Sequence, residues 1–334
     1  MICGVGHIGR RHATLVARQA GAALVALVEA RPELHPELME TFGVPVFGSL
    51  AEYLRAGLAA DVLTVATPNG SHAPLAVQAL RAGLHVVIEK PLAIRRLDAE
   101  EIVHTALQTG RRVFGVMQNR YSPPAAWLKE VVEAGRLGQI YLVQLNCLWN
   151  RDARYYQPGS WRGTRQHDGG TLFTQFSHFI DLLYWVFGDI TAIQSRFYDF
   201  AHAGLTEFED SGLVTFELVR GGAGVLQYST AVWDRNLESS ITVVAERGSV
   251  KLGGQYLDKV EVCHLDDGYV LPPLAPTNPA NDYGAYQGSA ANHVQLIENV
   301  LDALRGDSPL TTNALEGLKV VDIIERIYAA GPRA

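Results

Sequence analysis

Short apolar runs alternate with stretches of helical periodicity over the first third of the chain. Four of these short apolar runs predict strands that are buried on both faces. Two further segments carry apolar side chains at i, i+3 and i+4, which is the spacing of amphipathic helices. Strands and helices that alternate in this way predict a parallel sheet covered by helices on both sides. The expected strands are residues 24–28, 61–66, 85–88 and 113–117, and the expected helices are residues 72–82 and 97–108.

The pattern changes after about residue 118. Successive β-type runs joined by Gly-containing turns replace the alternation between residues 190 and 264, which indicates a wide, largely antiparallel sheet. The other expected elements are a helix over 124–134, a strand over 140–149, a long apolar helix over about 171–187, a loop over 272–286, and helices over 289–305 and 312–330.

These patterns predict an α/β fold with two domains, which suits a length of 334 residues. Residues 1–118 are expected to form a doubly wound parallel sheet. Residues 119–334 are expected to form a second domain of helices and strands, of the α+β type, built on a large, open and mostly antiparallel sheet. This domain is expected to serve substrate binding and oligomerisation.

Charge and cysteine content narrow the class of protein. A net charge of −7 gives no basic face for nucleic acid or a membrane surface, although a local cationic pocket remains compatible with it. Three widely spaced cysteines form neither a disulfide framework nor a metal motif, so a reducing, cytoplasmic location is expected. No apolar run approaches the roughly 20 residues of a membrane span, and the opening segment lacks the order of a signal peptide.

The first motif with chemical content is a Gly-x-Gly-x-x-Gly loop. Gly4, Gly6 and Gly9 precede a predicted helix, and Glu29 ends the next strand about 20 residues on, as a dinucleotide-binding Rossmann domain requires. The glycines let backbone N–H groups approach a pyrophosphate, and Glu29 can accept hydrogen bonds from ribose hydroxyls. A 2′-phosphate would meet the charge of Glu29, which favours NAD over NADP, while Arg31 opposes that preference.

The strand before this loop is unusually short. Three residues precede Gly4, whereas strands commonly have five or six. Two explanations stay open: the strand is stunted, or the true start lies upstream of the first residue given.

Two loops follow predicted parallel strands, at the sheet edge where ligands of α/β proteins bind. Glu89-Lys90-Pro91 follows one strand, and Thr67-Pro68-Asn69, with His72 shortly after, follows the preceding one. Burial and a nearby nicotinamide both disfavour a charged lysine, so Lys90 is a candidate for proton transfer. Pro91 is a candidate for a cis peptide.

The segment after Asp168 carries polar residues on an otherwise apolar helix. Thr174, His178 and Asp181 are expected to share one face, with Gln175 at its edge. A buried polar stripe is costly unless it faces a cavity or finds partners. A satisfied core histidine explains His178 taken alone, and Asp181 is either its partner or bonded elsewhere.

Together these motifs resemble the Gfo/Idh/MocA oxidoreductase family, and Trp161-Arg162-Gly163 and Gly169-Gly170 extend the resemblance over nearly the whole chain. The resemblance implies a Rossmann domain followed by a domain with a large open sheet, and metal-free hydride transfer between a sugar or polyol and NAD. The family's lysine and histidine fall on Lys90 and His178. The cofactor site it implies comprises Gly4, Gly6, His7, Ile8, Gly9, Glu29, Thr67, Pro68, Asn69, His72, Glu89, Lys90, Gln118, Trp161 and Arg162. The substrate site it implies comprises Lys90, Asn119, Arg120, Arg162, Thr174, Gln175 and His178.

One departure from the family pattern is informative. Inositol and simple-sugar dehydrogenases carry Asp four residues before the histidine and Gly two before it, whereas this chain has Thr174 and Phe176. The Lys–Asp–His triad is therefore incomplete. Residues 118–121 and 161–164, together with Gln175, Asn292 and His293, resemble the branch that oxidises C3 of UDP-N-acetylglucosaminuronate.

The hypothesis is oxidation of a sugar ring hydroxyl to a ketone. One of Lys90 and His178 accepts the hydroxyl proton and the other polarises the oxygen, and the sequence leaves their order open. Relatives in the family imply a homodimer or homotetramer that buries the open sheet face. The candidate anion ligands are Arg120, Arg151, Arg154, Arg162 and Arg165.

Three alternatives accompany this hypothesis. An inositol or simple-sugar dehydrogenase shares the same motifs. A non-catalytic NAD-binding sensor is favoured by the missing Asp and disfavoured by Lys90 and His178. An NADP-dependent enzyme resembling biliverdin reductase or dihydrodiol dehydrogenase is disfavoured by Glu29.

Overall fold

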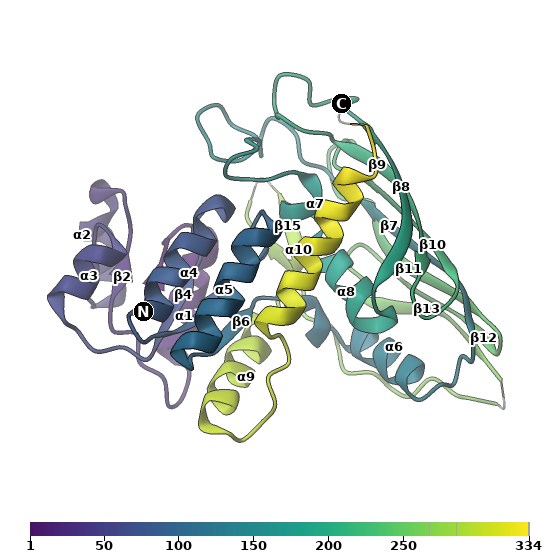
Figure 1. The fold of residues 1–334 in the computed structure, drawn as a ribbon, viewed down its shortest axis with the longest axis horizontal. Coiled ribbons are helices and arrows are strands. Elements are labelled where there is room, and N and C mark those ends of the chain that lie inside the picture. The colour runs from purple at the N-terminus through teal and green to yellow at the C-terminus, as the bar shows by residue number, and fades with distance from the viewer. Residues whose placement is uncertain (267, 285, 333–334) are drawn as a thin grey trace. The chain divides into compact units, whose positions relative to one another are not determined.

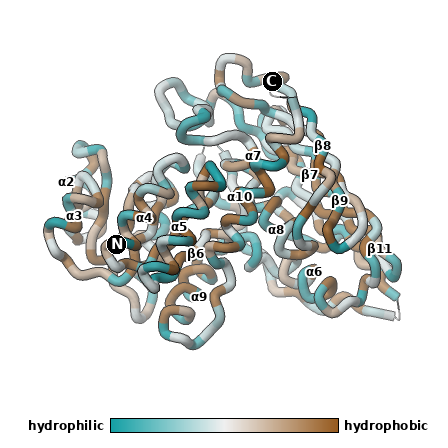
Figure 2. Tube along the Cα trace, viewed as in Figure 1, coloured by the Kyte–Doolittle hydropathy of each residue, from teal (hydrophilic) through white to brown (hydrophobic). Residues whose placement is uncertain are grey.

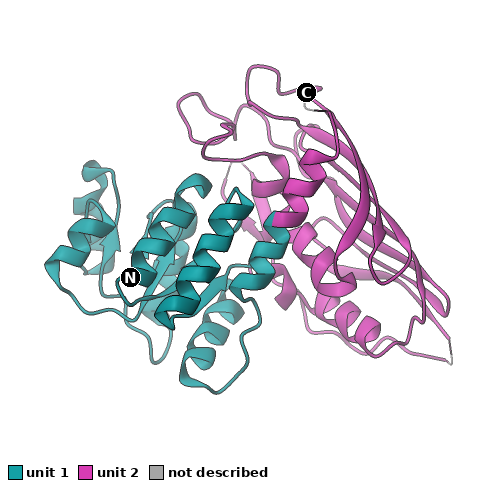
Figure 3. Cartoon of the chain, in the orientation of Figure 1, with its two compact units in different colours: residues 1–117, 293–321 teal, residues 118–292, 322–334 magenta. Residues whose placement is uncertain are grey.

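The computed structural model describes residues 1–266, 268–284 and 286–332, and these form two compact units (Figure 3). Unit 1 comprises residues 1–117 and 293–321, and unit 2 comprises residues 118–292 and 322–334. The predicted boundary near residue 118 agrees with this division. The prediction that all of residues 119–334 form one domain needs correction, because residues 293–321 belong to unit 1.

Unit 1 is built on a six-stranded parallel sheet in the order β3-β2-β1-β4-β5-β6, the strand order of a Rossmann domain. Its hydrophobic strands lie between amphipathic helices, along which hydrophobic and hydrophilic residues alternate (Figure 2). The strands are β1 (Ile2–Cys3), β2 (Leu27–Val28), β3 (Val46–Phe47), β4 (Val62–Val65), β5 (His85–Ile88) and β6 (Val113–Gly115). The helices are α1 (His7–Arg18), α2 (His35–Phe42), α3 (Leu50–Ala56), α4 (His72–Arg81), α5 (Arg96–Thr109), α9 (His293–Arg305) and the first part of α10 (Ala314–Ala329), with short 3₁₀ turns at Pro32–Leu34 and Asn69–Ser71.

Helix α9 joins unit 1 because its apolar face is buried there. Leu296, Ile297 and Val300 are buried, and α9 contacts α1. The following segment also hydrogen-bonds to the edge of the sheet, where the Gly115 N–H donates to the carbonyl of Thr312 over 3.0 Å. Helical periodicity identifies an amphipathic helix but does not identify the surface that covers it, which is why the sequence assigned α9 to the wrong domain.

Unit 2 contains a seven-stranded sheet in the order β13-β12-β11-β7-β10-β9-β8. Strands β7 and β10 are parallel and all other neighbours are antiparallel, which confirms the predicted open, mostly antiparallel sheet. The strands are β7 (Ile140–Leu148), β8 (Ile190–Tyr198), β9 (Ser211–Leu218), β10 (Ala223–Ser229), β11 (Glu238–Ala245), β12 (Gly248–Gly253) and β13 (Lys259–Leu265).

The two faces of this sheet differ in their cover. Along β9, Val214 and Phe216 are buried, whereas Leu213 and Thr215 are exposed. Helices α6 (Pro123–Glu133) and α8 (Ser177–Phe187) lie along the face that is buried (Figure 1). Leu142 of β7 and Val244 of β11, which are cross-strand partners, are also exposed.

Two local predictions in unit 2 were wrong. The helix expected over about 171–187 is broken into α7 (Thr171–Thr174) and α8, because Phe176 leaves the helical conformation with φ −116° and ψ 7°. The loop expected over 272–286 contains β14 (Ala280–Asp282), which pairs with β15 (Gln287–Ala290). Among the described residues, none of the helices combines the length and the apolar character needed to cross a membrane.

Candidate active site

The glycine loop of unit 1 has the geometry of a phosphate-binding turn. Gly4 has a φ of +84°, and a Cβ there would lie 2.7 Å from the Ala66 carbonyl oxygen, while a Cβ on Gly9 would lie 1.8 Å from the carbonyl oxygen of Gly4. A Cβ on Gly6 would meet nothing within 4 Å. The first and third glycines are therefore needed for packing, whereas the second leaves open space at the start of α1. This space fits a cofactor pyrophosphate at a helix N-terminus, where the predicted residues His7 and Ile8 begin α1.

Glu29 follows β2 and is held beside the same loop. Its Oε2 accepts a hydrogen bond from the Val5 N–H at 2.9 Å, and Oε1 accepts one from Arg31 Nε at 2.8 Å. Although burial raises the pKa of Glu29, the hydrogen bonds from Arg31 and Val5 outweigh burial and lower it. The carboxylate is thus available as an acceptor for ribose hydroxyls. Arg31 opposed the predicted preference for NAD over NADP. In the structure it is paired with Glu29, the residue that favours NAD.

The loop after β4 is fixed to the loop after β5 by His72. This fully buried ring lies 2.9 Å from the Thr67 carbonyl oxygen through Nε2 and 2.7 Å from the Pro91 carbonyl oxygen through Nδ1. The Thr67 hydroxyl also accepts a hydrogen bond from the hydroxyl of Ser71. Pro68 precedes the 3₁₀ turn Asn69–Ser71, and Asn69, its first residue, is buried. His72 therefore joins the two predicted cofactor loops to each other, with both ring nitrogens facing backbone carbonyls.

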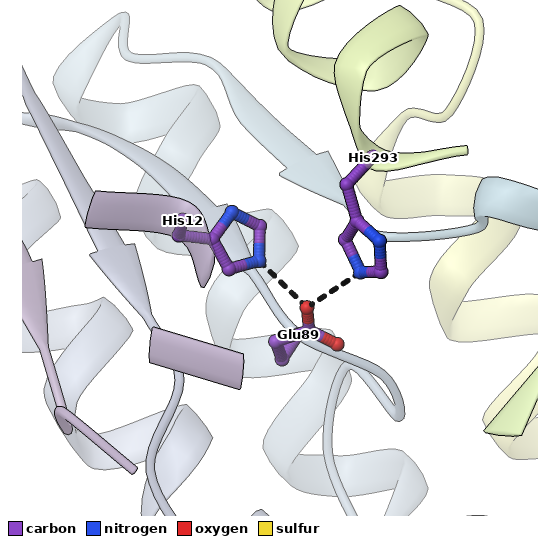
Figure 4. Close-up of side chains that lie close together, drawn as sticks. All are labelled: His12, Glu89 and His293. Carbon is purple, nitrogen blue, oxygen red and sulfur yellow. Dashed lines mark hydrogen bonds and ion pairs between the residues drawn. The ribbon is translucent and has the colours of Figure 1, made fainter. Parts of the chain in front are cut away.

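Glu89, Lys90 and Pro91 follow β5 at the same edge of the sheet, and the Lys90–Pro91 peptide is cis. Glu89 is buried, and its Oε1 lies 2.7 Å from His12 Nε2 and 3.6 Å from His293 Nε2 (Figure 4). Its Oε2 accepts a hydrogen bond from the backbone N–H of Lys90 at 3.2 Å. Lys90 is half-buried, so its ammonium can reach a ligand while its backbone is fixed.

In unit 2 the segment 118–121 forms a short 3₁₀ turn, and its predicted site residues have different surroundings. Gln118 is tied to its own unit, because its Nε2 donates to Ser289 Oγ and its Oε1 accepts from the N–H of Asn292. Asn119 is 3% exposed, and neither of its amide atoms has a hydrogen-bond partner among the described residues. Because buried amides are normally hydrogen-bonded, Asn119 is a strong candidate for contact with a ligand.

Arg120 forms a fully buried ion pair with Asp181 of α8. Its Nε donates to Asp181 Oδ2 at 2.9 Å and its Nη2 donates to Oδ1 at 2.6 Å. This bidentate geometry answers the question of the partner of Asp181, which the sequence had left open. It also gives Arg120 a structural partner inside unit 2, in addition to its predicted role as an anion ligand.

The break before α8 changes the predicted polar face. Thr174 belongs to α7, and its hydroxyl donates to the carbonyl oxygen of Asp168 at 3.0 Å and to the Asp168 carboxylate. His178 is the second residue of α8 and is buried, as is Asp181 one turn later. The expected stripe of Thr174, His178 and Asp181 along one helix therefore needs correction, since Thr174 lies beyond the break. A carboxylate does accompany Thr174, but it is that of Asp168.

Gln175 is held between Arg151 and Tyr155. Its Oε1 accepts from Arg151 Nε at 2.7 Å and its Nε2 donates to the Tyr155 hydroxyl at 2.9 Å. Arg151 is buried and also donates to Asn236 Oδ1 and to the carbonyl oxygen of Gln287. Burial lowers the pKa of Arg151 from its ordinary value.

Arg162 shares the aromatic surroundings of Arg151. Its guanidinium carbon lies 4.5 Å from the ring centroid of Tyr155 and 5.6 Å from that of Tyr286, and the corresponding distances for Arg151 are 5.3 and 5.1 Å. Arg162 Nη2 donates to the Tyr286 hydroxyl, and its Nε has no hydrogen-bond partner among the described residues. The half-buried Trp161 precedes it, with its ring 5.5 Å from the same guanidinium.

The other two predicted arginines of this region are engaged at the surface. Arg154 is exposed and paired with Asp152 at 2.8 Å. Arg165 is exposed, and its backbone N–H donates to Glu207. The buried Arg151 and the half-buried Arg162 are therefore the two arginines that face the same pair of tyrosine rings, and among the described residues neither lies within ion-pair distance of a carboxylate.

The structure thus groups the predicted residues by unit. Gly4 to Glu89 and Lys90 gather at one edge of the unit 1 sheet, whereas Asn119, Arg162, Gln175 and His178 belong to unit 2.

Three residues that contact these predicted site residues were not found by reasoning from the sequence. A signal for His12 existed, since a histidine three residues after Gly9 lies on the buried side of an amphipathic helix. Tyr155 and Tyr286 gave no comparable signal, because they stand in irregular segments.

Comparison with known proteins agrees with this geometry. Residues 1–116 match an oxidoreductase family with an NAD-binding Rossmann fold, and residues 126–251 match the Gfo/Idh/MocA C-terminal domain. The chain is similar to the WlbA dehydrogenase of Bordetella pertussis, solved in complex with NADH and UDP-GlcNAcA. That similarity is 31% identity with a TM-score of 0.88, over 98% of this chain and 94% of the other.

Two further relatives extend the comparison. The WlbA dehydrogenase of Chromobacterium violaceum, also solved with NADH and UDP-GlcNAcA, is 29% identical with a TM-score of 0.87, over 98% of this chain and 92% of the other. An inositol 2-dehydrogenase 4 of Saccharopolyspora erythraea is 31% identical over 280 residues, which cover 82% of this chain and 79% of that protein. The chain belongs to the Gfo/Idh/MocA oxidoreductase family, and its N-terminal unit is an NAD-binding Rossmann domain.

Proposed function

We propose that this chain oxidises a ring hydroxyl of an anionic sugar, of the UDP-N-acetylglucosaminuronate class, with NAD as the hydride acceptor. As a Gfo/Idh/MocA member it is an NAD(H)-dependent dehydrogenase of sugar or polyol CH–OH groups. The observation that carries the substrate class is the pair of guanidiniums of Arg151 and Arg162, which face the rings of Tyr155 and Tyr286 and have no carboxylate within ion-pair distance among the described residues.

Two neighbouring like charges repel each other, and the burial of Arg151 and partial burial of Arg162 remove part of the hydration that would screen them. The tyrosine faces offset part of that cost by cation–π attraction. An anionic substrate offsets more, because a guanidinium binds carboxylate or phosphate oxygens with charge-assisted hydrogen bonds. The free Nε of Arg162 is such a donor, whereas a neutral inositol would leave the pair of charges unbalanced.

Six of the predicted residues have distinct roles in this mechanism. Gly6 and the start of α1 would hold the pyrophosphate, and Glu29 would hold the adenosine ribose. A nicotinamide bound there would supply the hydride acceptor for the substrate carbon. Lys90 and His178 handle the proton of the hydroxyl being oxidised, one removing it and the other donating a hydrogen bond to the oxygen. Arg162 and Asn119 orient the substrate.

A substrate comparison tests the proposed class. NADH formation would be measured with UDP-N-acetylglucosaminuronate, with UDP-N-acetylglucosamine, which lacks the carboxylate, and with myo-inositol. The uronate should give the highest kcat/KM, and Arg162→Gln should raise its KM by about 10–100-fold, as expected for a lost charged hydrogen bond. Arg165→Gln, an exposed arginine of the same region, serves as the control. Preference for myo-inositol would reject the anionic class, and no turnover of any sugar in a wider panel would favour the sensor.

The proton-handling roles are tested by Lys90→Met and His178→Asn. Each should lower kcat by roughly 10²–10⁴-fold, the usual contribution of general acid–base catalysis, with NADH affinity nearly unchanged. The double variant should lose less than the product of the two effects, because groups that act together are not additive. Near-full turnover by Lys90→Met would remove Lys90 from the mechanism. The pH–rate profiles of the two variants would show which residue is the base.

The exposed sheet face of unit 2 supports the expected homo-oligomer. Leu142, Leu213 and Val244 are at least 40% exposed on strands β7, β9 and β11. Obligate interfaces of this type bury roughly 2,000 Å² or more. Light scattering should give a dimer or tetramer at micromolar concentration, and a stable monomer would contradict the proposal.

A further inference from the structure

A buried cluster in unit 1 contacts the main chain of the predicted catalytic lysine, Lys90. It consists of His12 from α1, Glu89 after β5 and His293 at the start of α9, whose rings point at the carboxylate from two sides (Figure 4). The three residues are 1%, 7% and 2% exposed. The two imidazoles also contact each other edge to face, with centroids 5.4 Å apart. Polar groups buried this deeply are costly unless they are partnered, so the cluster needs an explanation beyond packing.

The carboxylate of Glu89 uses its two oxygens for different partners. Oε1 faces His12 Nε2 at 2.7 Å and His293 Nε2 at 3.6 Å. Oε2 accepts the backbone N–H of Lys90 at 3.2 Å. Glu89 therefore connects helices α1 and α9 to the main chain of Lys90.

The other side of the tripeptide is fixed as well. The carbonyl oxygen of Pro91 faces Nδ1 of the buried His72 on α4 at 2.7 Å. The turn from which the Lys90 side chain departs is thus held on both sides by buried histidines. Catalytic groups require placement to within about 0.5 Å, which residues behind the site usually provide.

The geometry argues against the alternative that the cluster holds a metal ion. A zinc ion would lie about 2.0–2.2 Å from every ligand atom, and each ligating histidine would normally hydrogen-bond through its other nitrogen. Here His12 and Glu89 are in direct hydrogen-bond contact, and Nδ1 of His293 has no hydrogen-bond partner among the described residues.

We propose that His12 and His293, acting through the carboxylate of Glu89, are positioning residues for Lys90. This inference rests on the proposed function, in which Lys90 handles the substrate proton. The charged and titratable groups that face the cluster are Arg11 of α1, His72 of α4 and Lys90 itself. Arg11 and Lys90 are the cationic groups around this single carboxylate, so the loss of either histidine shifts the field at Lys90 as well as its backbone position.

The experiment compares His12→Asn, His12→Leu and His293→Leu with the control His104→Asn, which alters an exposed histidine on α5. The first readout needs no substrate. The acylation rate of Lys90 by an amine-reactive reagent is followed by mass spectrometry as a function of pH in the otherwise intact protein. The Leu variants should change this rate at least 3-fold or shift its pH midpoint, the Asn variant should retain part of the wild-type behaviour through its amide donor, and His104→Asn should match wild type.

The second readout is turnover of UDP-N-acetylglucosaminuronate. The Leu variants should lower kcat by about 10-fold or more with KM and NADH affinity within about 3-fold of wild type, and neither should lower kcat further in a Lys90→Met background. Wild-type Lys90 labelling in both Leu variants would overturn the inference, as would a stoichiometric metal ion found in the wild-type protein. If Lys90→Met itself keeps full turnover while the labelling changes stand, the proposed function fails and the positioning of Lys90 does not.

Discussion

Unit 1 and unit 2 each contain a buried glutamate that lies beside two hydrogen-bonding side chains of one kind, and these two carboxyl groups behave in opposite ways. Glu89 of unit 1 faces two histidines, and Glu209 of unit 2 accepts hydrogen bonds from the hydroxyls of Tyr228 and Tyr328 at 2.9 and 2.7 Å. Burial alone raises the pKa of both. At Glu89 the interactions with His12 and His293 outweigh burial and hold the pKa well below its ordinary value. At Glu209 the tyrosines do not outweigh it, and the pKa rises to about 7.

The two pKa values differ because histidine and tyrosine partners differ in the charge that they can carry. An imidazole can carry a positive charge beside a carboxylate, whereas a phenol offers only a dipole. The cluster behind Lys90 therefore keeps its carboxylate charged throughout the neutral range. The cluster in unit 2 gains or loses a proton near neutrality. Tyr328 also accepts a hydrogen bond from the N–H of Leu172 at 3.1 Å, so Glu209 is linked to the turn that precedes α8.

The largest expected effect comes from breaking the unit 1 cluster. His12→Leu leaves the buried carboxylate of Glu89 with the more distant His293 as its remaining histidine partner, and removal of one partner of a buried charge typically costs about 3–5 kcal/mol. The free energy of unfolding should fall by that order in urea titrations followed by circular dichroism. All five tryptophans of the chain lie between residues 127 and 233, in unit 2. Tryptophan fluorescence should therefore report a smaller change, and a loss below about 1 kcal/mol in the circular-dichroism titration would show that His12 is not the main partner of Glu89.

The next effect is the pH dependence of unit 2. Because the folded pKa of Glu209 is raised from 4.5 to about 7, folded unit 2 holds a proton that the unfolded chain releases. The contribution of Glu209 is thus fully present below about pH 4.5 and is lost as pH rises through 7, by roughly 3 kcal/mol. Glu89 contributes with the opposite sign. Its pKa is lowered in the folded state, so its stabilisation is present at neutral pH and is lost only as pH falls below the ordinary pKa of a glutamate.

Glu209→Gln separates these two contributions. The amide keeps an oxygen that can accept both tyrosine hydroxyls but does not titrate, so unit 2 unfolding followed by tryptophan fluorescence should lose most of its slope between pH 5 and 8. Glu209→Asp, which still titrates, is the comparison variant. A slope in Glu209→Gln equal to that of wild type would assign the pH dependence to another group.

The smallest effect should follow from Tyr328→Phe. It removes one of the two donors to Glu209 and the acceptor for the Leu172 N–H, each of which contributes about 1 kcal/mol to stability. The free energy of unfolding at pH 5 should fall by about 1–2 kcal/mol, and the pH midpoint assigned to Glu209 should rise, since a donor that lowers its pKa is gone. Fluorescence-monitored unfolding at several pH values measures both, and a downward shift of the midpoint would contradict the comparison between phenol and imidazole partners.

Much of the fold was predictable because local sequence dictates it. The apolar run 85–88 is β5, and the amphipathic segment 72–82 is α4 within one residue. The alternation of these elements in unit 1, and the Gly turns between strands in unit 2, predicted the two kinds of sheet that the structure contains. Gly4, Gly6, Gly9 and Glu29 predicted the cofactor edge because a tight turn, a close backbone approach and a strand-end acid are local requirements.

The sequence by itself determined the class of fold, the cofactor-binding edge and the family, because hydrophobic periodicity and short motifs act over a few residues. Only the tertiary structure decided which partner each buried polar side chain found. Arg120 pairs with Asp181 and Thr174 with Asp168, while Glu89 meets His12 and His293 from helices at opposite ends of the chain. Nothing local fixes such pairs, because the free energy of burying a charge depends on the side chains that the folded chain brings around it.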